Sequence, residues 1–152
     1  MNHTFHRAER LKSEKVITRL FNKEGRSFSC YPLRLVWSEI ENPPASDNSL
    51  GEITTNTPDF PIQFALSVSK RTFKHAHDRN LMRRRIREAY RLHKHELYQL
   101  LQKPAFAEFQ NKQFAFMVLY TAKEELPYDE IERGIKKMIY KFEKELASIS
   151  EK

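Results

Sequence analysis

Residues 76–102 read AHDRNLMRRRIREAYRLHKHELYQLLQ and contain neither proline nor glycine. Apolar residues recur in this stretch every three or four positions, which predicts one long amphipathic helix. A helical wheel at about 100° per residue gathers its apolar side chains into one stripe: Met82, Ile86, Ala89, Tyr90, His93, Leu97, Leu100 and Leu101. We expect this stripe to rest on a sheet and so to organise the fold.

The opposite side of this predicted helix is cationic. A row of mostly basic residues lies on this side: Asn80, Arg84, Arg87, Arg91 and Lys94. Arg83 lies at the boundary of this row. Arg79 projects toward the apolar side at the helix start, so we expect Arg79 and Asn80 to fix the local fold as well as to contact a ligand. The arginines at 83, 84, 85 and 87 nearly abut, and we expect a polyanion to relieve their mutual repulsion.

The positive charge of the chain is concentrated in this region. Residues 70–94 hold ten basic and two acidic residues, so they carry +8, whereas the whole chain carries +7. A nearly neutral body with one basic segment indicates a polyanion-binding protein, and arginine suits bidentate contacts to phosphate. The alternative is a solubilising basic face, but such faces usually interleave both signs of charge.

Alternating and periodic segments surround the basic helix. Apolar and polar side chains alternate in residues 31–40 and 62–70, a pattern that predicts two strands. Residues 113–121 are apolar on both faces and predict a central strand. A short amphipathic helix is expected over about 13–22, and a long one from Pro127 to about 149. Residues 41–61 hold four of the seven prolines and predict a long loop. The order helix, strand, strand, helix, strand, helix indicates a single-domain α+β sandwich with helices covering a mixed sheet.

Composition narrows the cellular setting. A chain of 152 residues suits one domain, and its lone cysteine, Cys30, is expected to be a small core residue. The first fifteen residues lack the apolar region of a signal peptide, and no stretch is long and apolar enough to span a bilayer. We therefore expect a cytoplasmic protein that does not enter a membrane.

Several motifs in order resemble the protein subunit of bacterial ribonuclease P. Leu66-Ser67-Val68-Ser69-Lys70-Arg71 ends the second strand, and a short turn leads to Ala76-His77-Asp78-Arg79-Asn80, Arg83-Arg84 and Arg87-Glu88. Arg10-Leu11-Lys12, Leu20-Phe21 and Gly25 fit the opening helix and turn of that family. The likeness covers about residues 5–142, apart from an apparent insertion at about 42–61. Two departures are Leu81, where the family has an arginine, and residues 118–121, where a usual arginine is missing.

The resemblance implies a fold and a function. The fold would have a left-handed βαβ crossover, like the second domain of ribosomal protein S5, instead of the usual right-handed one. With a large catalytic RNA, the protein would help to remove the 5′ leader of precursor tRNA by hydrolysis of one phosphodiester bond. Magnesium ions held by the RNA would perform this chemistry. The protein would supply no catalytic residue, bind no cofactor or metal of its own, and require no protein partner.

The resemblance also implies two binding surfaces. One would contact the catalytic RNA through Lys70, Arg71, Arg79, Asn80, Arg83, Arg84, Arg87 and Arg91. The other, a cleft between the first helix and one sheet face, would bind the single-stranded leader through Ile17, Phe21, Arg34, Val36, Ala65 and Ser67. An aromatic ring beside a cation suits sequence-tolerant binding of an extended strand. That Ile17 and Phe21 are ordinary core residues is an open alternative.

Other functions receive less support from the residues. A protein-only nuclease would need clustered carboxylates for magnesium, whereas the acidic residues are scattered. The pairs His75 and His77, and His93 and His95, suggest a zinc site only weakly, and His93 on the apolar stripe is better explained as a core histidine. An arginine-rich helix could also enter a DNA groove or bind a ribosome, although the chain lacks a helix-turn-helix pair or a zipper.

Overall fold

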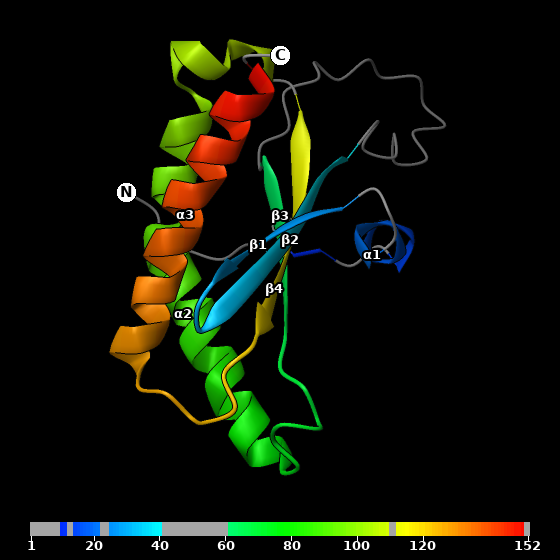
Figure 1. The fold of residues 1–152 in the computed structure, drawn as a ribbon, viewed down its shortest axis with the longest axis vertical. Helices are drawn as coiled ribbons and strands as arrows, with labels where there is room; N and C mark the ends of the chain where they lie inside the picture. Colours follow the sequence, from blue (N-terminus) through cyan, green and yellow to red (C-terminus); the bar gives the residue numbers. More distant parts are fainter. Residues whose placement is uncertain (1–9, 12–13, 22–24, 41–60, 110–111, 151–152) are drawn as a thin grey trace, which may run out of the picture.

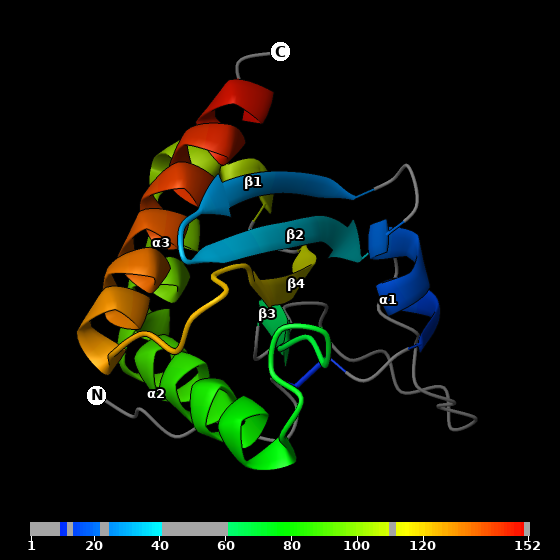
Figure 2. The same cartoon turned by 60° about the horizontal axis from the view of Figure 1, so that its bottom comes forward.

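The helices and strands come from a computed structural model, which describes residues 10–11, 14–21, 25–40, 61–109 and 112–150. In chain order the elements are α1 (Glu14–Phe21), β1 (Arg26–Cys30), β2 (Leu33–Ile40), β3 (Ile62–Ser67), α2 (Ala76–Leu101), the short 3-10 helix η2 (Pro104–Phe109), β4 (Gln113–Tyr120) and α3 (Tyr128–Ser150). The two long helices α2 and α3 lie side by side on one face of the sheet, and α1 lies on the other (Figures 1 and 2). This is the mixed α+β architecture that the sequence predicts.

The sheet has the strand order β1-β2-β4-β3. β3 pairs with β4 in parallel, and the remaining pairs are antiparallel. β4 therefore lies between two neighbours, with helices on both of its faces, and Phe114, Ala115, Phe116 and Val118 are completely buried. The predicted central position of residues 113–121 is confirmed.

The edge strand β1 was missing from the sequence prediction, which had three strands. Its sequence RSFSC is mostly exposed, and only Phe28 and Cys30 pack into the core, so the segment carries little apolar alternation. The chain turns at Tyr31 and Pro32, and β2 consequently begins at Leu33 rather than at residue 31. The predicted ends of the first helix at 13 and 22, and the predicted loop up to residue 60, lie outside the described residues.

The main core lies between the sheet and the two long helices. Seven of the eight residues of the predicted α2 stripe are buried, and Tyr90 stacks on Phe64 of β3 with ring centroids 3.9 Å apart. Two positions differ from the prediction. His93 is only half-buried, because it reaches toward α3. Lys94 is 3% exposed instead of facing outward, because it follows Tyr90 by one helical turn and its aliphatic stem is covered beside the stripe.

A second, smaller core lies under α1. It consists of Leu11, Leu20, Val36, Ile40, Ala115 and Met117, with Val16 and Ile17 packed against it. Gly25 closes the turn after the helix, where a Cβ atom would lie 2.0 Å from the carbonyl oxygen of Leu20. This close approach explains why glycine follows the helix, and it fixes α1 on the sheet face that carries the even-numbered residues of β2.

Candidate nucleic-acid interface

The exposed part of the basic surface spans the turn before α2 and the first half of that helix. Lys70 and Arg71 are exposed in the turn, and Asn80, Arg84 and Arg87 are exposed on the helix. The backbone N–H of Arg71 donates to Ser69 Oγ (3.1 Å), which fixes the start of the turn. These five side chains, together with the half-buried Arg79 and Arg83, form what we call the α2 basic surface.

Arg79 fastens the turn to the helix. Its Nη1 atom donates to the carbonyl oxygens of Phe73 (2.8 Å) and Lys74 (3.0 Å). The guanidinium thereby satisfies two carbonyl groups just outside the first turn of α2, where the N-cap residue His75 provides no side-chain cap. The predicted role of Arg79 in the local fold is confirmed, whereas its contact with a ligand stays a prediction.

The consecutive arginines of α2 separate in space. Arg85 points toward the segment before α3, where its Nη1 donates to Leu126 O (2.6 Å) and lies 3.5 Å from Glu125 Oε1. Arg83 lies 3.5 Å from the side-chain oxygen of Asn80. The expectation that all four guanidinium groups nearly abut was therefore wrong, because successive helical residues point in directions about 100° apart. Arg84 and Arg87 remain as the two fully outward cations.

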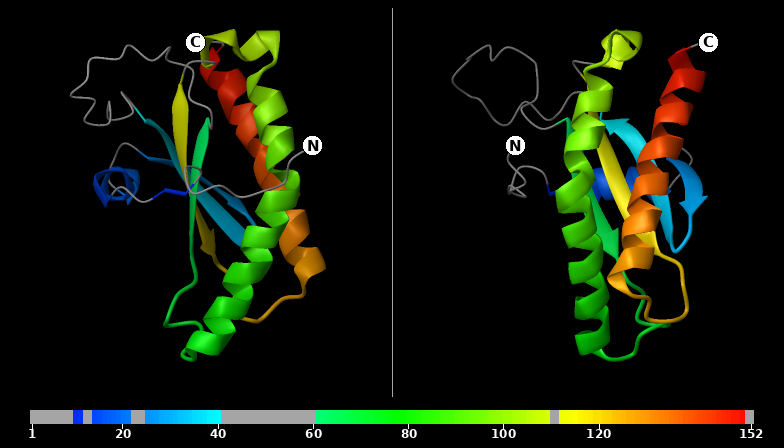
Figure 3. Two further views of the ribbon diagram at one scale, coloured as in Figure 1. Left: turned by 180° about the vertical axis from the view of Figure 1, so that it is seen from behind. Right: turned by 90° about the vertical axis from the view of Figure 1, so that its left-hand side faces the viewer.

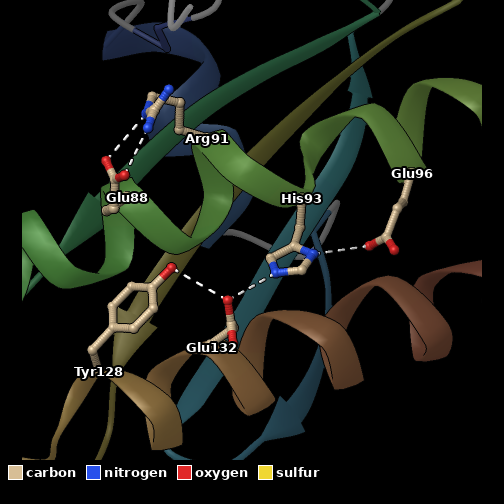
Figure 4. Close-up of polar contacts among 6 residues, drawn as sticks. All are labelled: Glu88, Arg91, His93, Glu96, Tyr128 and Glu132. Atoms are coloured by element: carbon tan, nitrogen blue, oxygen red, sulfur yellow. Dashed lines mark hydrogen bonds and ion pairs between the residues drawn. The ribbon is translucent and has the colours of Figure 1, made fainter. Parts of the chain in front are cut away.

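Arg91 has a carboxylate partner on its own helix. Its Nε and Nη2 atoms donate to the two oxygens of Glu88 at 3.1 and 2.7 Å (Figure 4). The hydrogen bonds from Arg91 lower the pKa of the Glu88 carboxyl. Arg91 thus enters any phosphate contact with its charge already balanced, and it extends the α2 basic surface less than its position in the sequence suggests.

The six residues predicted for the leader cleft come from the α1 side of the sheet. Their strand positions form two rows: Arg34 pairs with Leu119 and Leu119 with Ser67, while Val36 pairs with Met117 and Met117 with Ala65. Arg34 and Ser67, at the two ends of the first row, are exposed. The second row, which contains Val36, Met117 and Ala65, is more deeply buried beside α1. Arg34 is held by a hydrogen bond from its Nη2 to Ser27 Oγ (2.9 Å).

The two α1 residues of the predicted cleft have different environments. Ile17 is half-buried and packs on the second core, so the core explanation fits it. Phe21, at the last position of α1, is 55% exposed. An exposed phenylalanine at this helix end can stack on a base, whereas the buried Leu20 beside it cannot.

One hollow is lined by residues from both sides of the sheet, and it could not be found from the sequence. It has a volume of about 590 Å³ and is lined by Val16, Arg19, Arg26, Trp37, Ser38, Glu39, Ile40 and Ile149. Its walls come from α1, β1 and β2, which follow one another in the chain, and from the distant helix α3. The guanidinium carbon of Arg26 lies 6.0 Å from the centroid of the Trp37 ring, so a cation lines the wall next to the buried indole.

The lone cysteine and the possible metal ligands remain to be placed. Cys30 is buried, and desolvation raises the pKa of its thiol to about 11, so little thiolate exists at neutral pH. Among the described residues, no three His, Cys, Asp or Glu side chains are grouped closely enough to hold a metal ion. No helix in the described part of the chain is long and apolar enough to cross a membrane.

Comparisons with known proteins agree on one family. A family model described as Ribonuclease P matches residues 5–143. Proteins named "Ribonuclease P protein component" from two strains of Porphyromonas gingivalis are 31% and 30% identical over 134 residues, which cover 88% of this chain and 82% of theirs. The solved structure of the Staphylococcus aureus RNase P protein has a similar fold, with a TM-score of 0.53 and 18% identity over 90% of this chain and 95% of that one.

Proposed function

This chain belongs to the ribonuclease P protein family, and on that premise we propose that it docks on the catalytic RNA through α2 and binds the 5′ leader of precursor tRNA on the α1 face of its sheet. Membership makes it the protein component of a tRNA-processing ribonucleoprotein and implies an RNA partner. The proposal adds which surface meets which RNA.

The observation that carries the docking surface is the exposure of Arg84 and Arg87 beside the basic turn. The apolar stripe of α2 is buried on the sheet, so the helix is fixed in place before any partner arrives. Arg79 fixes the turn in the same way. A rigid surface loses little conformational entropy on binding, which favours phosphate contacts at defined positions.

The leader surface is supported by a separate set of contacts. Arg34 and Ser67 are the exposed ends of one cross-strand row, and Phe21 is exposed on the helix that covers the adjacent row. A cation, a hydroxyl group and an aromatic ring on one face suit an extended single strand, since the ring stacks on a base and the polar groups contact the backbone. The half-buried Ile17 and Ala65, with the buried Val36, would form the apolar floor.

The chemistry in this proposal belongs to the RNA. Hydrolysis of the phosphodiester bond would occur at Mg²⁺ ions held by the RNA and the substrate, while the protein raises substrate affinity and specificity. We assign no catalytic residue and no cofactor to the protein, and we place the single 152-residue domain in the cytoplasm without a required protein partner. The proposal includes the left-handed crossover of the family and its likeness to the second domain of ribosomal protein S5. The parallel pairing of β3 with β4, joined through α2, supports the crossover connection.

Reconstitution with precursor tRNA tests the proposal directly. The protein together with its catalytic RNA should release the leader at a low magnesium concentration at which the RNA alone is slow. The protein alone should cleave nothing, and cleavage by purified protein without RNA would overturn the division of labour.

A binding series separates this function from the DNA-binding alternative. Affinity for the catalytic RNA and for duplex DNA should be measured across a range of salt concentrations, because phosphate contacts give both a salt dependence. We expect tighter binding to the RNA at every concentration. Equal affinity for the two polyanions would favour a general arginine-helix module.

A further inference from the structure

The outward face of α3 carries a row of cations that lies outside the motifs quoted above for the family resemblance. We call its exposed cations and the tyrosine among them the outer α3 stripe: Arg133, Lys136, Lys137, Tyr140, Lys141 and Lys144. Residues three and four positions apart share one face of a helix, so these side chains form a continuous strip. At a rise of 1.5 Å per residue, the strip is roughly 16 Å long. The exposed Asp129 and Ser148 lie at the two ends of the same face.

The composition of α3 does not indicate a cationic surface, because the helix has no net charge. The helix holds five cations and five carboxylates, at positions 129, 130, 132, 143 and 145. The structure separates the two signs. Glu132 bonds His93 of α2, Glu143 pairs with Lys103, and Glu145 accepts a hydrogen bond from the Trp37 indole (2.6 Å). Three of the carboxylates therefore neutralise or satisfy other parts of the protein, and the lysines are left facing solvent.

The four lysines of the stripe have no ion-pair partner among the described carboxylates. Lys141 donates to the carbonyl oxygen of Ser29, and the ammonium of Lys144 lies 4.6 Å from the centroid of the Tyr140 ring. Only Arg133 pairs with a carboxylate, that of Glu130 (3.3 Å). Four lysines on one helical face, with an exposed tyrosine among them, form a local anion-attracting surface, although the charge of Lys136 also acts on Glu132.

This stripe is separate from both surfaces of the proposed function. α3 covers the sheet face opposite α1, and the edge strand β1 lies between the stripe and Arg34, with Lys141 donating to the carbonyl oxygen of Ser29 on that strand. A groove of about 400 Å³ between α2 and α3 borders the stripe on its α2 side, with Glu96, Gln99, Leu100, Lys103, Lys136, Ile139, Tyr140 and Glu143 along it. The right-hand view of Figure 3 looks onto the outer side of these two helices.

We propose that the outer α3 stripe is a second contact surface for the phosphate backbone of folded RNA. Lysine suits this role because a flexible ammonium group contacts phosphates without requiring a defined geometry. The Tyr140 hydroxyl can donate to a phosphate oxygen. Backbone contact is favoured over base readout because most of the lysines lie along the exposed side of α3, outside the groove that Lys136 and Tyr140 border. The inference rests on the proposed function, in which a folded RNA is the partner.

The test compares a double variant of the stripe with a control variant in the full-length protein. Lys137→Gln with Lys144→Gln removes two charges from the stripe, and binding to a labelled RNA duplex of about 20 base pairs, longer than the ~16 that a double-stranded-RNA domain spans, is measured across a salt series. The slope of log affinity against log salt should decrease by about two, because each lost phosphate contact removes about 0.9. Lys123→Gln, in the exposed loop before α3, is the matched control and should leave the slope unchanged.

A charge-conserving variant and the α2 double variant make the outcomes distinguishable. Lys137→Arg with Lys144→Arg should retain the full slope. If Arg84→Ala with Arg87→Ala lowers the slope while the stripe variant does not, the proposed function stands and the stripe proposal is wrong. If the stripe variant weakens only the binding of single-stranded RNA, backbone contact with folded RNA is also refuted. A lowered slope in both variants supports two contact surfaces.

Discussion

The Nε2 atom of His93 on α2 lies 3.1 Å from Oε2 of Glu132 on α3 (Figure 4). The other ring nitrogen, Nδ1, lies 3.3 Å from Glu96 Oε2, and the Tyr128 hydroxyl donates to Glu132 Oε2 (3.4 Å). Each ring nitrogen of His93 thus faces a carboxylate oxygen. His93, which the sequence places in an apolar stripe, therefore forms a polar contact between the two long helices α2 and α3.

The contact between His93 and Glu132 should make part of the free energy of unfolding depend on pH. The hydrogen bond with His93 is the main cause that lowers the pKa of Glu132 below its ordinary value of 4.5. A carboxyl with a lowered folded pKa stabilises the fold above its unfolded pKa, and this contribution is lost as pH falls through the folded value. Glu132→Gln should therefore lower the free energy of unfolding at neutral pH by about 1 kcal/mol. Urea denaturation should show the difference shrinking below pH 4.5; an equal difference at neutral and at strongly acidic pH would contradict this account.

The α2 basic surface should dominate the salt dependence of RNA binding. Arg84→Ala with Arg87→Ala should flatten the salt slope by about two and weaken binding to the catalytic RNA. Arg91→Ala should reduce the slope by less than one, because Arg91 is already bonded to Glu88. Fluorescence titrations at several salt concentrations measure both effects. An unchanged slope in the double variant would show that the outward arginines are not the contact surface.

Arg79 should contribute more to folding than to RNA affinity. Arg79→Ala removes two hydrogen bonds to the carbonyls of Phe73 and Lys74, which should cost about 2 kcal/mol of unfolding free energy. Thermal and urea unfolding measure this loss. The salt slope for RNA should decrease by no more than one. Wild-type stability in this variant would mean that the turn is held by other contacts.

Phe21 should matter for the leader and little for the fold. Because its side chain is 55% exposed, Phe21→Ala should leave stability nearly unchanged, whereas Leu20→Ala at the buried neighbour should cost about 2–5 kcal/mol. If the ring stacks on a leader base, the holoenzyme with Phe21→Ala should lose roughly 1 kcal/mol or more of precursor tRNA affinity. Affinity for mature tRNA should be unaffected, and an equal loss for both tRNAs would argue against leader contact.

Gly134 should resist substitution although it lies within a helix. A Cβ atom there would lie 3.0 Å from Pro32 Cδ and 3.2 Å from the carbonyl oxygen of Cys30, both of them rigid neighbours. Alanine improves helix propensity by about 1 kcal/mol, but overpacking costs about 1–3 kcal/mol. We expect Gly134→Ala to destabilise the protein by about 1 kcal/mol in urea unfolding. Ser148→Ala, on an exposed position of the same helix, should be nearly neutral; a stabilised Gly134→Ala variant would show that α3 can shift.

Local periodicity determined much of this protein. The spacing of apolar residues located α2 almost to the residue, identified most of its buried side chains, and distinguished the doubly covered β4 from the half-covered strands. These features follow from side-chain direction along a regular backbone, which depends only on neighbouring residues. The motif around Arg79, Asn80 and Arg87 also identified the family, because a motif is a property of the sequence itself.

Tertiary structure decided which charges remain available. Arg91 and Lys94 were predicted to lie in the outward row with Arg84 and Arg87, but Arg91 bonds a carboxylate and Lys94 is buried. Arg85, which was expected to abut its neighbouring arginines, donates to a backbone carbonyl oxygen instead. The neutral helix α3 became a cationic surface because Glu132, Glu143 and Glu145 pair with groups on other elements. Pairing across the fold depends on residues far apart in the chain, so periodicity cannot predict it. The sequence alone thus determined that a basic helix exists and where it lies, and the packing determined which of its cations face a partner.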